Sequence, residues 1–235
     1  MVYKEKSRHA LKFLSDIFDL FLPRLCPSCG NKLNSVEESI CVNCFLQIKP
    51  VSSSRLSHEY QHMFKSKSII TGFTSLYLFE KDKEIQKIIH AIKYQKRFLT
   101  GELLGKVLGE KIQNENWNID LIIPVPLHHL KKAERGYNQS FYIAWGVNKI
   151  LKKKLNDKSL KRIKYTETQT AMNIVKRVEN ISGAFSVKHK DNVIGKSVLL
   201  IDDVITTGAT ISECGSVLLE NGASKIFAAS LAIAD

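Results

Sequence analysis

The sequence predicts an α/β protein in which helices cover both faces of a mostly parallel sheet, with a small cysteine-rich segment in front. Short apolar runs such as residues 198–201 have the length and composition of strands buried on both faces. These runs alternate with amphipathic helical patterns, such as residues 84–94. A chain of 235 residues is long enough for one substantial core and a small appendage.

The first segment, residues 8–22, carries apolar residues at the spacing of one helical stripe and ends at Pro23. We predict a packing helix there. The sequence has no run of eighteen or more apolar residues and no apolar segment ending in a small-residue cleavage site. We therefore expect no membrane span and a cytoplasmic location.

Four cysteines follow as two CxxC pairs, Cys26 with Cys29 and Cys41 with Cys44. Paired CxxC turns allow four thiolates to converge on one zinc ion, and Gly30 permits the tight turn after the first pair. In a cytosolic chain, metal ligation is a better interpretation than disulfides. The sequence therefore predicts a structural zinc ribbon. The fifth cysteine of the chain, Cys214, lies on the apolar stripe of a later helix and is predicted to pack in the core.

Composition divides the chain into three parts. Residues 1–49 hold the first helix and the ribbon. Residues 50–68 are rich in Ser, His and Lys and are predicted to form a linker. The main domain then covers 69–235, with a strand at 69–79, two helices, and a strand at 119–123.

A basic segment follows the strand at 119–123. It contains Lys131 and the sequence RGYNQS at residues 135–140, which begins with Arg135 at a predicted helix start. Such a segment can meet a highly charged anion such as pyrophosphate. The alternative is a basic loop with an Asn or Ser helix cap. A second basic run, residues 149–164, is interpreted as a solvated helix end.

Residues 165–185 are polar and lack a regular period, as expected of a mobile loop that folds over a ligand. Gln169 and Arg177 are the candidate ligand contacts in this loop. The formal net charge of +12, from 35 Lys and Arg against 23 Asp and Glu, favours polyanionic partners.

The most informative stretch is residues 198–210, VLLIDDVITTGAT. A buried strand ends in Asp202 and Asp203, and a hydroxyl- and glycine-rich turn then opens a helix. Free backbone N–H groups at a helix start suit a phosphate monoester. Carboxylates at the end of a strand suit a vicinal diol, in the place where open α/β sheets bind ligands. A ribose 5-phosphate has both groups.

This stretch resembles the binding motif of type I phosphoribosyltransferases, which hold 5-phosphoribosyl 1-pyrophosphate (PRPP). The resemblance implies that Asp202 and Asp203 take the ribose hydroxyls. It also implies that the following loop takes the 5′-phosphate through Thr206, Thr207, Gly208, Ala209 and Thr210. Purine salvage enzymes of this fold usually carry an aspartate where this chain has Thr206, so purine salvage is disfavoured.

Further motifs in one order extend the resemblance to the ComF family, competence-associated proteins with a phosphoribosyltransferase domain. These are CPSCG and CVNC in the ribbon, HAIKYQ at 90–95, PVPLHH at 124–129, RGYNQS, GAF at 183–185, and LLIDDVITTGAT. The resemblance implies a type I phosphoribosyltransferase fold and a role in the uptake of single-stranded DNA during natural transformation, alongside a competence helicase and other competence proteins. For bound PRPP we further expect contacts from Lys131, Arg135 and Arg177, with Mg2+ beside the pyrophosphate if the site is catalytic.

Three functions of different classes remain open from the sequence. The first is a DNA-uptake protein that uses its PRPP pocket for binding or sensing and contacts single-stranded DNA. The second is an active phosphoribosyltransferase, in which Asp202, Asp203 and Arg135 are catalytic and the acceptor is unknown. The third is an adaptor whose zinc ribbon docks a helicase partner.

Overall fold

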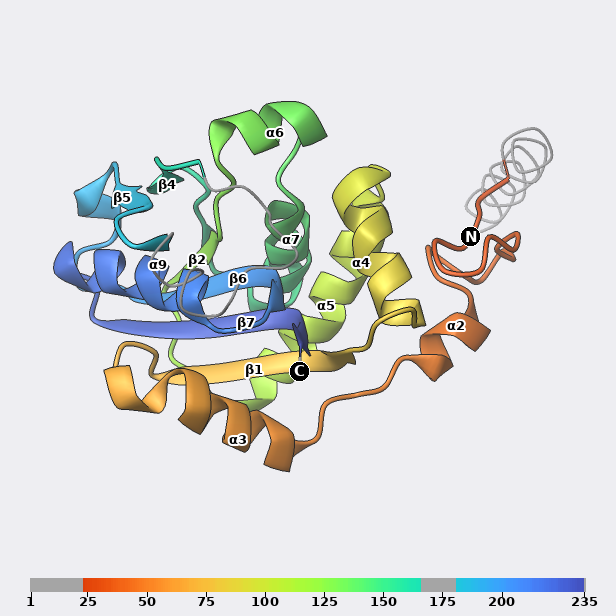
Figure 1. Ribbon diagram of the computed structural model, residues 1–235, viewed down its shortest axis with the longest axis horizontal. Helices are drawn as coiled ribbons and strands as arrows, with labels where there is room; N and C mark the ends of the chain where they lie inside the picture. The colour runs from red at the N-terminus through yellow and green to blue at the C-terminus, as the bar shows by residue number, and fades with distance from the viewer. Residues whose placement is uncertain (1–22, 166–180, 235) are drawn as a thin grey trace, which may run out of the picture.

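The computed structural model describes residues 23–165 and 181–234, and its centre is a five-stranded parallel sheet (Figure 1). The strand order is β1-β7-β6-β2-β3, and every neighbouring pair is parallel. The strands are β1 (Gly72–Phe79), β2 (Leu121–Pro124), β3 (Lys154–Leu155), β6 (Ser197–Ile205) and β7 (Lys225–Ala234). The predicted fold class is confirmed. Within the described ranges, none of the helices is long and apolar enough to cross a membrane.

Helices cover both faces of this sheet. One face packs against α4 (Glu84–Tyr94), α5 (Phe98–Asn114) and α7 (Gln139–Leu151). The other packs against α3 (Ser53–Met63) and α9 (Ala209–Glu220). The remaining elements are α2 (Val42–Gln47), η1 (Lys65–Lys67), α6 (His129–Arg135), η2 (Lys190–Asn192) and the antiparallel pair β4 (Leu160–Arg162) and β5 (Phe185–Val187).

The hydrophobic pattern explains the best-predicted elements. The predicted helix at 84–94 is confirmed as α4, and its apolar stripe of isoleucines is buried against the sheet. Strand β6 has five buried residues in a row from Ser197 to Ile201, as expected for a strand covered on both faces. It continues through Asp202 and Asp203 to Ile205, so the acidic pair lies within the strand and not at its end.

The interpretation of residues 50–68 as a linker is wrong, because residues 53–63 form helix α3. Ser52 caps the helix by accepting a hydrogen bond from Arg55 N. Leu56, Tyr60 and Met63 lie on one face of α3, which packs against the second face of the sheet, and Phe64 follows, fully buried. These four apolar residues have helical spacing, but Ser, His and Lys residues between them masked the pattern.

The topology creates a crevice between β2 and β6. These strands are neighbours, but α7 follows β2 on one face and α9 follows β6 on the other. Connections that leave in opposite directions open a space at the carboxyl ends of the two strands, which is where ligands bind in open α/β sheets. The sequence motif at 198–210 lies at this point.

Two predictions fall outside the described residues. These are the N-terminal helix at 8–22 and the central part of the loop at 165–185, including Gln169 and Arg177.

Candidate functional site

The loop between β6 and α9 surrounds a hollow lined by Asp202 and by residues 204–211. The N-cap residue of α9 is Gly208, which has no side chain to cap the helix, and the first turn has no acidic residue. Ala209 N makes a long hydrogen bond of 3.4 Å to Thr207 Oγ1. The helix start can still offer N–H groups to a ligand, and the positive end of the helix dipole favours an anion. This hollow contains all five loop residues that the resemblance assigned to the 5′-phosphate.

Gly208 is required at the start of α9 for two reasons. Its φ is +69°, in the left-handed region that favours glycine. A Cβ atom there would lie only 2.7 Å from Cε1 of Phe64 and 3.1 Å from Cβ of Met63. The end of α3 therefore supports the loop from below. Sequence reasoning missed both supporting residues because it placed them in a linker.

Asp202 is partly buried beside the start of α7. Its Oδ1 accepts hydrogen bonds from Ser140 Oγ at 3.0 Å and from Asp203 N at 2.9 Å. Burial, followed by the neighbouring charge of Asp203, raises the pKa of Asp202 to about 7. A carboxyl group that titrates near neutrality can change between accepting and donating hydrogen bonds, as many functional-site residues do.

Asp203 has different partners and is more deeply buried, with 4% of its surface exposed. Its Oδ1 lies 3.1 Å from Lys93 Nζ of α4 and accepts a hydrogen bond from Val204 N at 2.7 Å. Its Oδ2 is buried and has no hydrogen-bond partner among the described residues. The acidic pair is therefore divided, with Asp202 held by α7 and Asp203 by α4.

Lys93 and Ser140 were not predicted as site residues, although the sequence contained a signal for each. Lys93 lies off the apolar stripe of α4 and within HAIKYQ, and Ser140 ends RGYNQS. Their approach to the acidic pair depends on how α4 and α7 pack on the sheet.

The predicted pyrophosphate contacts Lys131 and Arg135 both lie on α6, which follows β2. Burial lowers the pKa of Lys131, as do the nearby charges of Arg162 and Arg135. Its Nζ lies 5.6 Å from the centroid of the Tyr165 ring. Arg135 stacks on the Tyr94 ring at 4.8 Å and donates a hydrogen bond to Gln139 Oε1 at 2.9 Å.

The interpretation of residues 149–164 as a solvated helix end is wrong for Arg162, which lies in strand β4. The residue is half-buried, and burial lowers the pKa of its guanidinium. The carboxylate of Asp202 is close enough to counter part of that effect. Lys131, Arg135 and Arg162 together give the crevice a positive side, and Arg162 was the member that sequence reasoning missed.

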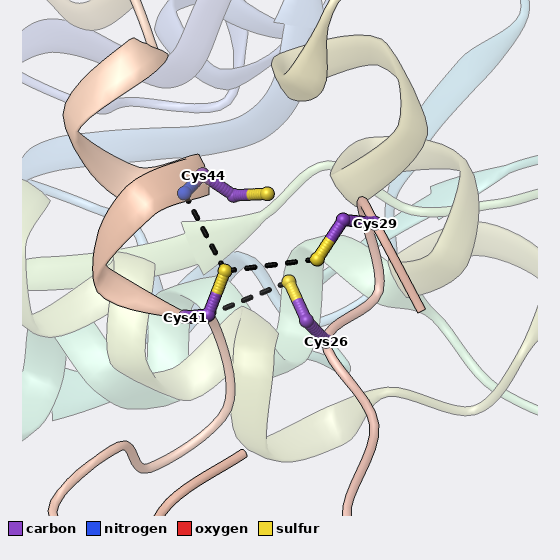
Figure 2. Close-up of side chains that lie close together, drawn as sticks. All are labelled: Cys26, Cys29, Cys41 and Cys44. Atoms are coloured by element: carbon purple, nitrogen blue, oxygen red, sulfur yellow. Dashed lines mark hydrogen bonds between the residues drawn. The ribbon is translucent and has the colours of Figure 1, made fainter. Parts of the chain in front are cut away.

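The four cysteines of the ribbon point toward a common centre (Figure 2). Their sulfur atoms all lie within 4.8 Å of one another, and the Sγ atoms of Cys29 and Cys41 are 3.7 Å apart. Zn–S bonds of about 2.3 Å in a tetrahedron give sulfur–sulfur distances of about 3.8 Å. Backbone N–H groups of Cys41 and Cys44 approach Sγ of Cys26 and Cys41. This cluster can hold a zinc ion.

The comparisons with known proteins agree with this geometry. The sequence model of the phosphoribosyl transferase domain family matches residues 138–234, which include β6, the β6–α9 loop and α9. Competence protein F of Haemophilus influenzae is 28% identical over 213 residues, covering 86% of this chain and 93% of that protein. Competence protein ComFC of Bacillus subtilis is 26% identical over 201 residues, covering 84% of this chain and 72% of that protein.

These matches support a ComF-family protein with a phosphoribosyltransferase-like domain. DNA utilization protein YhgH of Escherichia coli K12 is also similar, with 27% identity over 147 residues, covering 60% of this chain and 64% of that protein. The matches to the two competence proteins extend well beyond the matched domain. The ComF resemblance seen in the motifs is therefore confirmed over most of the chain.

Proposed function

We propose that this ComF-family chain binds PRPP in the crevice between β2 and β6 and acts in the cytoplasm in DNA uptake during natural transformation. One observation carries the proposal. A helix start without an acidic residue and two carboxylates with separate partners meet at the topological switch point of the sheet. The printed names of the relatives, which refer to competence and DNA utilization, support the second half of the proposal.

In this proposal each part of PRPP has a matching group. The 5′-phosphate would accept hydrogen bonds from the N–H groups and threonine hydroxyls of the loop 206–210. The ribose hydroxyls would donate to Asp202 and Asp203. The pyrophosphate would meet Lys131 and Arg135, with Arg177 as a further predicted contact.

The acidic pair also suits magnesium carried in with PRPP. Carboxylate oxygens are ligands that Mg2+ prefers, and Asp203 Oδ2 is a buried acceptor without a partner among the described residues. When bound, Mg2+ would neutralise part of the pyrophosphate charge. At the same time, Asp202 and Asp203 would hold the ribose in one fixed orientation.

Titration calorimetry with PRPP and Mg2+ tests the proposal. We expect binding by the wild type, a loss of at least about tenfold in affinity for Asp202→Asn, and a similar loss for Asp203→Asn. Asp157→Asn, a change at an exposed aspartate, is the matched control and should bind like the wild type. A folded wild-type protein that gives no heat with PRPP would contradict the proposal.

An active phosphoribosyltransferase is the enzymatic form of the same proposal. Arg135 would hold the leaving pyrophosphate as the bond from C1 to oxygen breaks, and Asp202 and Asp203 would stabilise the developing positive charge on the ribose. Release of pyrophosphate from PRPP in the presence of an acceptor would separate turnover from binding alone.

The ribbon supports a second candidate function, that of an adaptor for a helicase partner. Val36, Val42 and Leu46 are apolar, yet 83%, 53% and 76% of their surfaces are exposed. Exposed apolar side chains on a small metal-held unit are typical of protein contacts. Leu46→Ser should weaken such a complex while leaving PRPP binding intact.

A further inference from the structure

Four aromatic side chains form a row on the surface where α5 and α7 begin. Phe98 stacks on Tyr142 with ring centroids 4.4 Å apart and an interplanar angle of 22°. Tyr142 contacts Phe141 edge-on at 5.5 Å, and Phe141 stacks with Trp145 at 6.4 Å. Tyr94, at the end of α4, is also exposed, and its ring contacts His90 and Arg135. We call the four residues in contact with one another, Phe98, Phe141, Tyr142 and Trp145, the aromatic row.

The aromatic row is not needed for the core between the helices. The buried residues of α7 do not include any member of the row; they are Gln139, Ser140, Ile143, Ala144, Gly146 and Val147. Helices α5 and α7 approach so closely that a Cβ atom on Gly146 would lie 2.1 Å from the Glu102 carbonyl oxygen. The rings therefore lie beside this contact, and 42% of Trp145 and 54% of Tyr94 remain exposed.

Positive charge lies near the row. At its Trp145 end, Lys149 Nζ lies 5.9 Å from the ring centroid. Near the start of α7, Arg135 donates a hydrogen bond to Gln139 and lies 4.8 Å from the centroid of the Tyr94 ring. Glu102 is the acidic side chain next to Lys149, and it is already paired with Lys149 at 2.6 Å and with Lys106 at 3.3 Å.

A groove continues the row toward the ribbon. Residues 96–100, at the start of α5, face Arg24, Leu33, Glu38 and Ser39 of the ribbon across a cavity of about 270 Å³. Lys96, Arg97 and Phe98 thus line one wall of this groove. Figure 1 shows α4, α5 and α7 side by side, with α2 and the ribbon beyond α4.

We propose that single-stranded nucleic acid binds along the aromatic row, with bases stacked on the exposed rings and phosphates near Lys96, Arg97 and Lys149. Exposed rings interleaved with cationic groups are the features that bind single strands without sequence preference. In a duplex the bases are already stacked inside, so they cannot reach the rings. The proposal rests on the DNA-handling role proposed above and names the surface that performs it; it does not require that the β6–α9 loop holds PRPP.

The test measures binding of a fluorescent oligothymidylate of about 20 nucleotides to the full chain by fluorescence anisotropy. We expect the Kd to rise about tenfold for Trp145→Ala and further for Phe141→Ala combined with Trp145→Ala. Trp145→Phe, which keeps a ring, should retain most of the affinity. Ile194→Ala, a change at an exposed apolar residue outside the row, is the matched control.

Tryptophan fluorescence reports stacking directly. The chain has two tryptophans, and Trp117 is occupied by a stack with Phe227 at 4.9 Å. The oligonucleotide should quench the emission of Trp145, and the quench should disappear in Trp145→Phe. An intact quench in Trp145→Phe would overturn the proposal.

Two further results would also overturn it: affinity that is unchanged in the folded double variant, or equal affinity for a duplex of the same length. Calorimetry with PRPP on the same variants keeps the two proposals separate. Loss of oligonucleotide binding with intact PRPP binding supports nucleic-acid binding along the aromatic row. Absence of PRPP binding in a wild type that still binds the oligonucleotide would contradict only the PRPP proposal.

Discussion

The ribbon and the β6–α9 site are built in different ways. The four cysteines of the ribbon lie within 19 residues, from Cys26 to Cys44, and their spacing alone brings the sulfurs together. The β6–α9 site joins Asp203 to Lys93 of α4, Asp202 to Ser140 of α7, and Gly208 to Phe64 after α3. The cysteine cluster, which can hold a metal ion, therefore depends on local sequence, whereas the β6–α9 site depends on the packing of the whole sheet.

Removal of zinc should have the largest effect and should be confined to the ribbon. Structural zinc sites contribute about 10–16 kcal/mol of apparent binding free energy. The buried aliphatic side chains of the ribbon, Leu33, Ile40 and Ile48, join the core cluster that includes α4, but at about 2 kcal/mol each they contribute less than that. We expect stoichiometric zinc by elemental analysis. After chelation, amide exchange should accelerate at residues 24–48 while β6 stays protected. A ribbon that keeps its protection without metal would contradict this difference between the two regions.

Gly208→Ala should have the next largest effect, and it tests the support of the loop by α3. We expect a loss of about 2–4 kcal/mol in the free energy of unfolding, from backbone strain at φ +69° and from the clash with Phe64. Gly195→Ala is the matched control, because Gly195 has φ +70° and no atom within 4 Å of an added Cβ. Chemical denaturation should show a loss of only about 1 kcal/mol in the free energy of unfolding for Gly195→Ala. Equal losses in both variants would mean that the contact with Phe64 does not contribute to stability.

Asp202→Asn should have the smallest effect, visible in the pH dependence of stability. Burial raises the pKa of Asp202 to about 7 in the folded chain, from an ordinary value of 3.8. Between these values the folded chain binds more protons than the unfolded chain, so the free energy of unfolding falls as pH rises through this window. Removing the carboxyl group should flatten that fall. The full shift would correspond to roughly 4 kcal/mol, but Asp202 is partly exposed and solvent screens its charge, so we expect a smaller difference. The variant should be more stable than the wild type by about 1 kcal/mol at pH 8, with the difference fading toward pH 4.

Denaturation curves at several pH values measure this effect, with Asp157→Asn as the exposed control. A parallel pH profile for Asp202→Asn and the wild type would show that Asp202 is ordinarily solvated.

Local patterns predicted much of the fold because the information lies within single elements. The isoleucine stripe predicted α4, the apolar run predicted β6, and Asn221-Gly222 marks the end of α9. The helix α3 was missed because its four apolar residues are diluted by polar ones. Its hydrophobic face becomes evident only when the sheet that it covers is present.

The sequence by itself determined the four-cysteine cluster that can hold zinc and the strand–loop–helix motif of the site, because in both cases the chemistry needs residues at fixed short spacing. Only the tertiary structure decided what holds the acidic pair. Lys93 and Asp203 are 110 residues apart and meet at 3.1 Å, and Arg162 turned from a presumed solvated cation into a half-buried neighbour of Asp202. The physical reason is that a parallel sheet aligns the ends of strands and helices that are distant in sequence, and this alignment leaves no mark in any short window of residues.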